Sequence, residues 1–245
     1  RSPVSAERLE RWSTGERPSI LIKYFDAKGV METTRVLLVL AAHPFRETRW
    51  PLDVSKMVLG LEAAAPEYTA AKECGELDMN LGRGPVLLLS GGALGGEHVL
   101  AQSRSIERYL ARQLGMMGDD ELTAAHVDAF TEHLRDLKEK YQKMRSSATA
   151  ADKEARFAAF YSTTLPEFML HVEKTVPGGE DGALFGGRFT LADAALFVTF
   201  NDYFDNKAAA IAALDECPKL LASWNAVRQH PAVAQYLATR PDTKV

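Results

Sequence analysis

Tyr24 is the residue whose type and position best suit chemistry. It lies at the end of the apolar segment Ser19–Phe25, which is typical of a buried strand, and the turn Asp26–Gly29 follows it. A tyrosine at such a place is partly buried, and its hydroxyl can point into a cleft above the next helix. The alternative is a core tyrosine with one local hydrogen bond, and position alone favours that simpler interpretation.

Pro85 stands at the start of a second apolar segment, in the sequence Leu81–Pro85. A proline at the first position of a strand can be a plain edge feature. It can also follow a cis peptide bond, which is uncommon and usually conserved for a purpose. A cis bond here would turn the backbone of Gly84 toward the cleft. Its N–H and C=O would then pair with an extended peptide, as an added strand does.

Gln102 and Ser103 stand at the first turn of a predicted helix. Serine is a favoured N-cap residue, so capping alone explains it. A helix N-terminus also attracts anions, because its free N–H groups and the positive end of the helix dipole lie there. The functional interpretation is that these two residues hold a carboxylate group.

Other chemistry finds little support in the sequence. The six histidines lack the spacing of a metal site, so we expect no metal. The glycines between 91 and 96 lack the spacing of a dinucleotide loop. The cysteines Cys74 and Cys217 have no C-x-x-C partner, and inert free thiols are the simpler interpretation.

Two blocks of secondary structure must position these residues. We predict strands at 19–25, 45–50, 85–89 and 97–101, helices at 31–43 and from 102 onward, and a mixed helix and loop segment at 51–77. The first strand–helix–strand unit implies a parallel pair, and the last two strands form an antiparallel hairpin. Glu32 and Arg35 are placed on a face of the first helix away from its Leu and Val residues.

The second block is almost entirely helical, with predicted helices at 122–145, 152–176, 190–206 and 218–239, the last split at Pro231. Thr190–Asp193 has the sequence of a capping box. The predicted fold class is therefore an α+β thioredoxin-like N-terminal domain with an all-α C-terminal domain. The expected boundaries are an extension over 1–18, with a short helix near 6–12, then domains at 19–115 and 119–245.

Composition limits the classes of function. The chain has 245 residues, a formal net charge of −4 and 46% apolar residues, so it has no basic footprint for nucleic acid. No apolar run reaches the roughly 18 residues of a membrane span. We expect a cytoplasmic protein, and an organelle-targeting peptide removed before Arg1 stays an open alternative.

The order of these motifs resembles the cytosolic glutathione transferases. Tyr24-Phe25, the Leu81–Leu87 segment and the Gln102–Ala111 helix are similar to the glutathione-binding domain of that family. The tail from Pro231 resembles the sigma class, which includes the prostaglandin D synthase type. The resemblance implies a homodimer that uses glutathione as co-substrate and acts on a small hydrophobic electrophile.

The resemblance also implies a role for each matching residue. Tyr24 corresponds to the catalytic tyrosine, which holds the glutathione thiolate. The implied glutathione-binding residues are Tyr24, Trp50, Arg83, Gly84, Pro85, Gln102, Ser103 and Asp136, the last reaching the glutathione of the neighbouring subunit. The implied pocket for the second substrate contains Val30, Lys138, Tyr141 and Met144.

Val30 departs from the pattern, because the sigma class often has an arginine at that place. Three alternatives accompany the transferase prediction. A non-catalytic protein of this fold would serve as a structural or docking subunit. A glutathione-dependent isomerase of the prostaglandin D synthase type is the second, although the implied pocket is rather polar for it. A thiol–disulfide oxidoreductase would need a cysteine near positions 24–28, and none is present.

Overall fold

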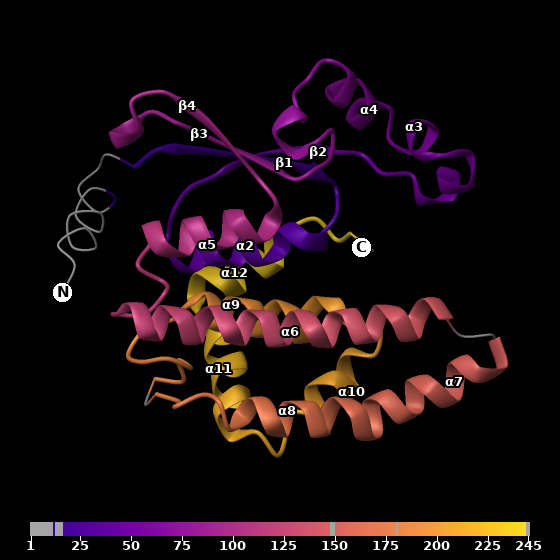
Figure 1. Cartoon of the computed structure of the whole chain (residues 1–245), viewed down its shortest axis with the longest axis vertical. Coiled ribbons are helices and arrows are strands. Elements are labelled where there is room, and N and C mark those ends of the chain that lie inside the picture. Colours follow the sequence, from indigo (N-terminus) through magenta and orange to yellow (C-terminus); the bar gives the residue numbers. More distant parts are fainter. Residues whose placement is uncertain (1–11, 13–16, 148–149, 180, 244–245) are drawn as a thin grey trace. The chain divides into compact units, whose positions relative to one another are not determined.

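The computed structural model describes residue 12 and residues 17–147, 150–179 and 181–243. These residues form two compact units (Figure 1). Unit 1 runs to Leu114 and takes up the chain again from Gln235, whereas unit 2 covers Gly115–Ala234. The division after Leu114 lies beside the predicted boundary, but the last segment of the chain packs with unit 1. Of the predicted extension, the helix near 6–12 lies outside the described residues except for Trp12.

Unit 1 is built on a four-stranded sheet with the order β2-β1-β3-β4. The strands are β1 (Ser19–Phe25), β2 (Arg46–Trp50), β3 (Val86–Ser90) and β4 (Glu97–Ala101). β1 pairs with β2 in parallel, and β3 pairs antiparallel with both β1 and β4. The predicted mixed thioredoxin-like sheet is confirmed, and the only strand bounds that moved did so by one residue.

Side chains alternate between the two faces of the sheet along β1 and β3, and one face carries large apolar residues of both strands. Ile20 lies opposite Leu89 and Ile22 opposite Leu87, and all four are at most 1% exposed. The helices α2 (Glu32–Leu40) and α5 (Ser103–Gln113) contact each other and lie together on one side of the sheet (Figure 1).

The other face of the sheet is covered by the segment between β2 and β3. It contains the 3-10 turns Val54–Leu59 and Asp78–Asn80 and the helices α3 (Leu61–Ala64) and α4 (Pro66–Glu73). Tyr68 and Leu77 join Trp50 and Val86 in a second core cluster. The prediction of short helices and irregular chain over 51–77 describes this segment correctly.

Among the described residues of unit 2, every regular element is a helix or a helical turn. Its elements are α6 (Glu121–Ser147), α7 (Ala150–Ala159), α8 (Leu165–Glu173), α9 (Leu191–Val198), α10 (Lys207–Ala212), α11 (Pro218–Gln229) and the start of α12 (Pro231–Thr239). π-helical turns at Phe160–Thr164 and Thr199–Tyr203 follow α7 and α9. The sequence did not predict these turns or α10 as separate elements, whereas the break at Pro231 is confirmed.

The predicted capping box at the start of α9 is present and buried. Asp193 Oδ2 accepts hydrogen bonds from the backbone N–H of Thr190 at 2.7 Å and from its hydroxyl at 2.8 Å. Asp193 Oδ1 accepts from the N–H of Leu184 at 2.8 Å and from Ser223 Oγ at 2.7 Å. Asp193 thus joins three segments of unit 2 in addition to starting a helix.

Candidate active site

Tyr24 lies at the end of β1, opposite Arg49 of β2. Its half-buried ring packs against Gly29, which has a φ of +47°. A Cβ at Gly29 would lie 2.6 Å from Tyr24 Oη and 2.8 Å from its Cε1. This position therefore favours glycine for two reasons: the backbone is left-handed, and the tyrosine ring occupies the space of a Cβ.

The hydroxyl of Tyr24 is kept protonated near neutral pH. Burial raises the pKa of Tyr24, although a hydrogen bond from the backbone N–H of Val30 and the positive charge of Arg35 act against this rise. A protonated phenol with its oxygen fixed by one N–H can still donate its own proton to a neighbouring anion.

Arg35 is fully buried beside this site. Its Nε donates to Glu47 Oε1 at 2.7 Å, and its Nη1 donates to Glu32 Oε2 at 3.0 Å. The carbonyl oxygens of Ala27 and Lys28 also accept from Nη1, both at 3.0 Å. Arg35 and Glu32 are 0% and 1% exposed, so the charged face that the sequence placed apart from the Leu and Val residues of this helix is buried as well. The paired charges make that burial tolerable.

The peptide bond between Gly84 and Pro85 is cis, as one of the two interpretations of this proline required. The space beside Gly84 is bounded by three aromatic side chains. A Cβ there would lie 3.5 Å from Trp50, 3.6 Å from Tyr24 and 3.8 Å from Tyr68. Gly84 and Tyr24 are therefore neighbours, although 60 residues separate them in the sequence.

Gln102 is the N-cap of α5, and Ser103 is the first residue of the helix and not its cap. Gln102 has a φ of +67°, which is rare for a residue other than glycine. Its amide Nε2 donates to Asn80 Oδ1 at 2.9 Å, and Asn80 Nδ2 donates to the carbonyl oxygen of Pro85 at 2.9 Å. Asn80 is 3% exposed and thus links the two backbone features that the sequence singled out. Sequence reasoning missed Asn80. Its only signal was a lone asparagine shortly before Leu81–Pro85.

Trp50 and Arg83 occupy different surroundings. The Trp50 ring is 3% exposed and packs edge-on against Phe25 and Tyr68 in the second core cluster. Arg83 is exposed, next to Gly84. In unit 1, Tyr24 and Trp50 thus pack against Gly84, and Pro85 follows Gly84 in the chain. Asn80 connects this group to Gln102.

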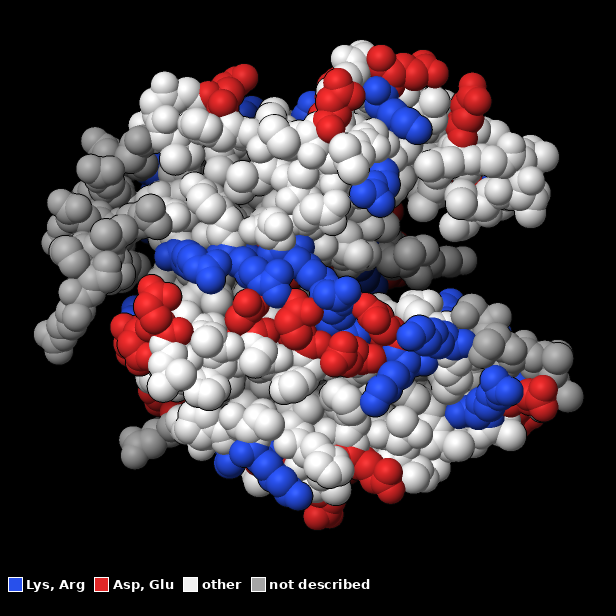
Figure 2. Space-filling model, viewed as in Figure 1, with Lys and Arg blue, Asp and Glu red and all other residues white. Residues whose placement is uncertain are grey.

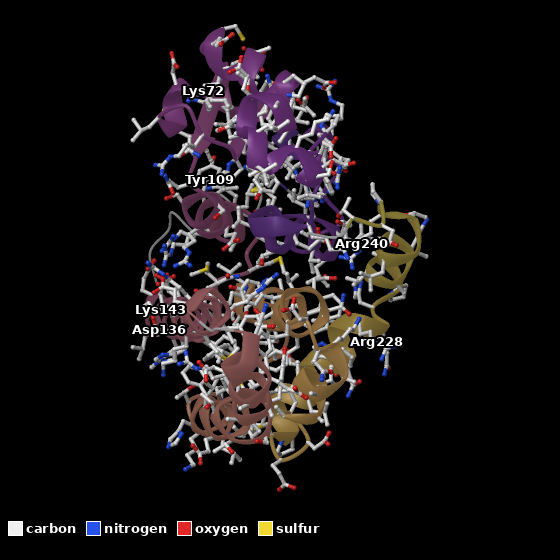
Figure 3. All side chains as sticks on the ribbon, turned by 90° about the vertical axis from the view of Figure 1, so that its right-hand side faces the viewer. Lys72, Tyr109, Asp136, Lys143, Arg228 and Arg240 are labelled. Atoms are coloured by element: carbon white, nitrogen blue, oxygen red, sulfur yellow. The ribbon has the colours of Figure 1, made fainter. Side chains whose placement is uncertain are left out.

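The remaining predicted site residues of the second block lie in unit 2. Asp136 is on the exposed surface of α6 (Figure 3). Tyr141 is fully buried, its hydroxyl 3.1 Å from that of Tyr161, and burial raises its pKa. The Lys138 ammonium lies 5.0 Å from the centre of the Tyr203 ring. Tyr141 therefore belongs to an aromatic core of this unit, and its predicted role in a substrate pocket stays a prediction. So do those of Lys138, of the half-buried Met144 and of Val30, which is 51% exposed on unit 1.

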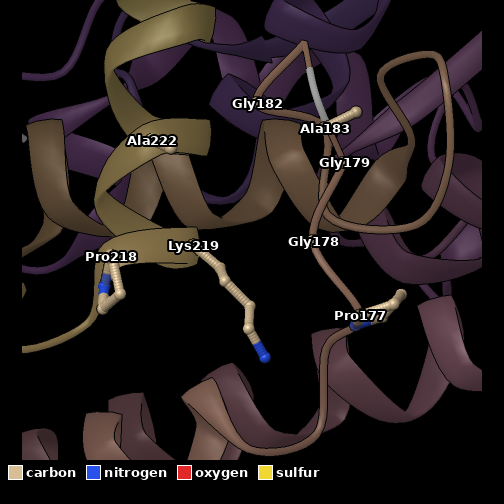
Figure 4. Close-up of a pocket in the computed structure, with 8 residues that line it drawn as sticks. All are labelled: Pro177, Gly178, Gly179, Gly182, Ala183, Pro218, Lys219 and Ala222. Atoms are coloured by element: carbon tan, nitrogen blue, oxygen red, sulfur yellow. The ribbon is translucent and has the colours of Figure 1, made fainter.

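Unit 2 also contains a cavity of about 390 Å³, shown in Figure 4. Its lining residues are Pro177, Gly178, Gly179, Gly182, Ala183, Pro218, Lys219 and Ala222. Lys219 Nζ donates to the carbonyl oxygen of Val176 at 2.8 Å, and the Glu173 carboxylate accepts from the N–H of Lys219 at 3.0 Å. None of the predicted site residues lines this cavity.

Within the described residues, no group of three His, Cys, Asp or Glu side chains is arranged to hold a metal ion. None of the described helices combines the length and the apolar composition needed to cross a membrane.

Comparisons with known proteins agree with this architecture. The family model described as "Glutathione S-transferase, C-terminal domain" matches residues 135–240. An S-crystallin of Nototodarus sloanii is 26% identical over 228 residues, which cover 92% of this chain and 98% of that protein. A probable glutathione S-transferase of Caenorhabditis elegans is 27% identical over 232 residues, covering 92% and 99%. The chain is therefore similar to glutathione S-transferases over more than nine-tenths of its length, and residues 135–240 match their C-terminal domain.

Solved glutathione S-transferases have the same fold. A pi-class structure from Onchocerca volvulus aligns with a TM-score of 0.68 at 24% identity, covering 90% of this chain and 93% of that one. A sigma-class structure from Fasciola hepatica aligns with a TM-score of 0.68 at 21% identity, covering 93% and 99%. At these identities the likeness concerns the fold.

Proposed function

We propose that the protein is a glutathione transferase in which Tyr24 holds the glutathione thiol as a thiolate. The observation that carries the proposal is the packing of Tyr24 against Gly29 and Gly84, with Asn80 linking Pro85 to Gln102. The comparisons also support it, because relatives that align with more than nine-tenths of the chain are named glutathione S-transferases.

The proposed chemistry follows from the acidity of thiols. A free thiol has a pKa of roughly 8.5, so little thiolate exists at pH 7. A hydrogen bond from the Tyr24 hydroxyl to sulfur favours the charged form by about 1.5–3 kcal/mol. The sulfur then forms a bond to an electrophilic carbon while the leaving group departs with its bonding electrons. Tyr24 keeps its own proton throughout.

The proposed binding mode assigns each end of glutathione to a different backbone feature. Gly84, before the cis bond, offers its backbone to the cysteinyl part, and Gln102 with Ser103 at the start of α5 receives the γ-glutamyl carboxylate. Arg83 and Trp50 are assigned to the remainder of the tripeptide. The second substrate is a small hydrophobic electrophile, with Val30, Lys138, Tyr141 and Met144 as its proposed neighbours.

We also propose a homodimer in which Asp136 reaches the glutathione of the partner. The resemblance of the segment around Asp136 to the family supports it. α5 carries Arg104, Arg108 and Arg112 at four-residue spacing, and basic side chains gather over this helix in Figure 2. Sedimentation at low and high salt would test whether two copies associate and whether charge contributes.

Assignment to the sigma class is a finer proposal that rests on the tail sequence. The aligned structures include pi-class, sigma-class and nu-class transferases at 21–24% identity. The fold therefore gives no preference among these classes.

A non-catalytic role is the second candidate, since two relatives at 25–26% identity are named S-crystallins. Calorimetric binding of glutathione and turnover of chlorodinitrobenzene separate the candidates. We expect both binding and turnover, with a turnover loss of about 10- to 100-fold in Tyr24→Phe, because that is the rate equivalent of one such hydrogen bond. Binding without turnover would favour the non-catalytic role, and absence of binding would refute the glutathione proposal.

A further inference from the structure

The C-terminal segment of unit 1 ends in the charge network that surrounds Arg35. Tyr236 donates its hydroxyl proton to Glu32 Oε1 at 3.0 Å, and the Arg240 guanidinium donates to the same oxygen. Arg35 Nη1 holds the other oxygen, Oε2, at 3.0 Å. The Glu32 and Arg240 side chains are 1% and 12% exposed, so one buried carboxylate receives three donors away from water.

The network continues from Arg35 to the end of the first strand. Glu47 Oε1 accepts from Arg35 at 2.7 Å, and its Oε2 accepts from Arg49 Nη1 at 3.0 Å. Arg49 Nε then donates to Asp26 Oδ1 at 2.7 Å. Asp26 follows Tyr24 by two residues in the chain.

Charges in this network balance only when the tail is included. Three arginines (Arg35, Arg49 and Arg240) face three carboxylates (Asp26, Glu32 and Glu47). Without Arg240 the same network would carry one net negative charge. Because most of its members are buried or half-buried, salt would screen that charge only weakly.

The charge of Arg35 reaches the phenol, since it opposes the rise that burial causes in the pKa of Tyr24. Arg35 Nη2 has no hydrogen-bond partner among the described residues, so the guanidinium is not fully engaged by its carboxylates. An anion held by the Tyr24 hydroxyl therefore lies within range of this network.

We propose that Arg240 is a positioning residue of the Tyr24 site: it supplies the third cation, keeps the network neutral, and so sustains the glutathione thiolate. The inference rests on the proposed function, because it needs a thiolate at Tyr24. It assigns a role in the reaction to the tail of the chain (Figure 3), some two hundred residues after the tyrosine.

The test measures the pKa of enzyme-bound glutathione from the ultraviolet absorption of its thiolate, together with the pH profile of kcat/KM for chlorodinitrobenzene. Arg240→Gln should raise that pKa by about half a unit, equal to roughly a threefold loss of kcat/KM below the pKa. Arg240→Lys keeps the charge and should restore the wild-type value. Arg46→Gln is the matched control, because Arg46 is exposed and lies opposite Leu21, three residues or ~10 Å along the strand from the level of Tyr24.

A second variant should shift the pKa of bound glutathione in the opposite direction. Asp26→Asn removes one anion and should lower the pKa of the bound thiol, and the double variant with Arg240→Gln should return it to the wild-type value. These comparisons remain valid if Arg240→Gln alone folds poorly, because Asp26→Asn by itself must then shift the pKa downward. Unchanged pKa values in Arg240→Gln or Asp26→Asn would overturn the inference. If wild-type protein with saturating glutathione shows no thiolate absorption, the proposed function itself fails, which is a separate result.

Discussion

Gly29 offers a way to displace the Tyr24 hydroxyl without removing it. In Gly29→Ala the new Cβ would lie 2.6 Å from Tyr24 Oη, whereas ordinary contact begins near 3.4 Å. The hydroxyl must therefore withdraw by about 0.8 Å (3.4 − 2.6). A misplacement of about 1 Å at a reacting centre can cost roughly a hundredfold in rate. We expect kcat/KM to fall by about 10- to 100-fold, close to the loss in Tyr24→Phe.

The assay is the initial rate of glutathione conjugation to chlorodinitrobenzene, with Tm measured on the same samples. Alanine at a left-handed backbone position costs about 1–2 kcal/mol of stability whatever its surroundings. Gly95→Ala is the matched control, because Gly95 has a φ of +68° and no atom within 4 Å of its would-be Cβ. It should lose stability and keep its rate.

A double variant decides whether the loss acts through the tyrosine. If the hydroxyl is the group displaced, Gly29→Ala should cost almost nothing further in a Tyr24→Phe background. Full activity in Gly29→Ala, or an equal further loss in the Tyr24→Phe background, would refute the reasoning.

Three further outcomes are expected. Asn80→Ala should raise KM for glutathione about 5- to 10-fold with kcat little changed, because Pro85 and Gln102 lose their shared partner; Asn206→Ala, which removes a helix cap in unit 2, should leave KM unchanged. Asp193→Ala should destabilise the fold by about 3–5 kcal/mol in thermal unfolding, since Thr190, Leu184 and Ser223 lose their acceptor; a loss under 1 kcal/mol would contradict this. Burial lowers the pKa of His43, so the unfolded chain binds a proton that the folded chain does not. The stability contribution of His43 should be present above pH ~6.5 and be lost as the pH falls toward the folded-state pKa, and urea unfolding of His43→Phe should show a smaller decline.

The sheet could be predicted from sequence because its signals are local. Ile20 and Ile22 alternate with half-buried residues, and turn-forming glycines separate β3 from β4. The position of Tyr24 at a strand end followed directly. The cis bond before Pro85 was one of two interpretations, because the presence of a proline does not determine whether the preceding peptide bond is cis or trans.

Pairing between distant side chains could not be predicted in the same way. Asn80 accepts a hydrogen bond from Gln102, 22 residues later, and no short sequence motif predicts such a pair. The burial of Arg35 and Glu32 could not be predicted, because charged residues are usually exposed and the partners Glu47 and Arg240, which make the burial possible, lie elsewhere in the sequence. Tyr141 is different, because its burial could have been predicted from the sequence. It follows Phe130, Leu134 and Leu137 at helical spacing on the buried stripe of α6.

The return of the chain to unit 1 has a consequence for biosynthesis. Glu32 is joined to Tyr236 and Arg240 across 204 and 208 residues. A ribosome adding about 5–20 residues per second needs roughly 10–40 s between the first and last of these partners. Throughout that interval the nascent unit 1 contains Glu32 without the two donors that arrive last. We expect its final consolidation to wait for these two residues, so protease resistance of stalled nascent chains should rise only once Arg240 has left the exit tunnel.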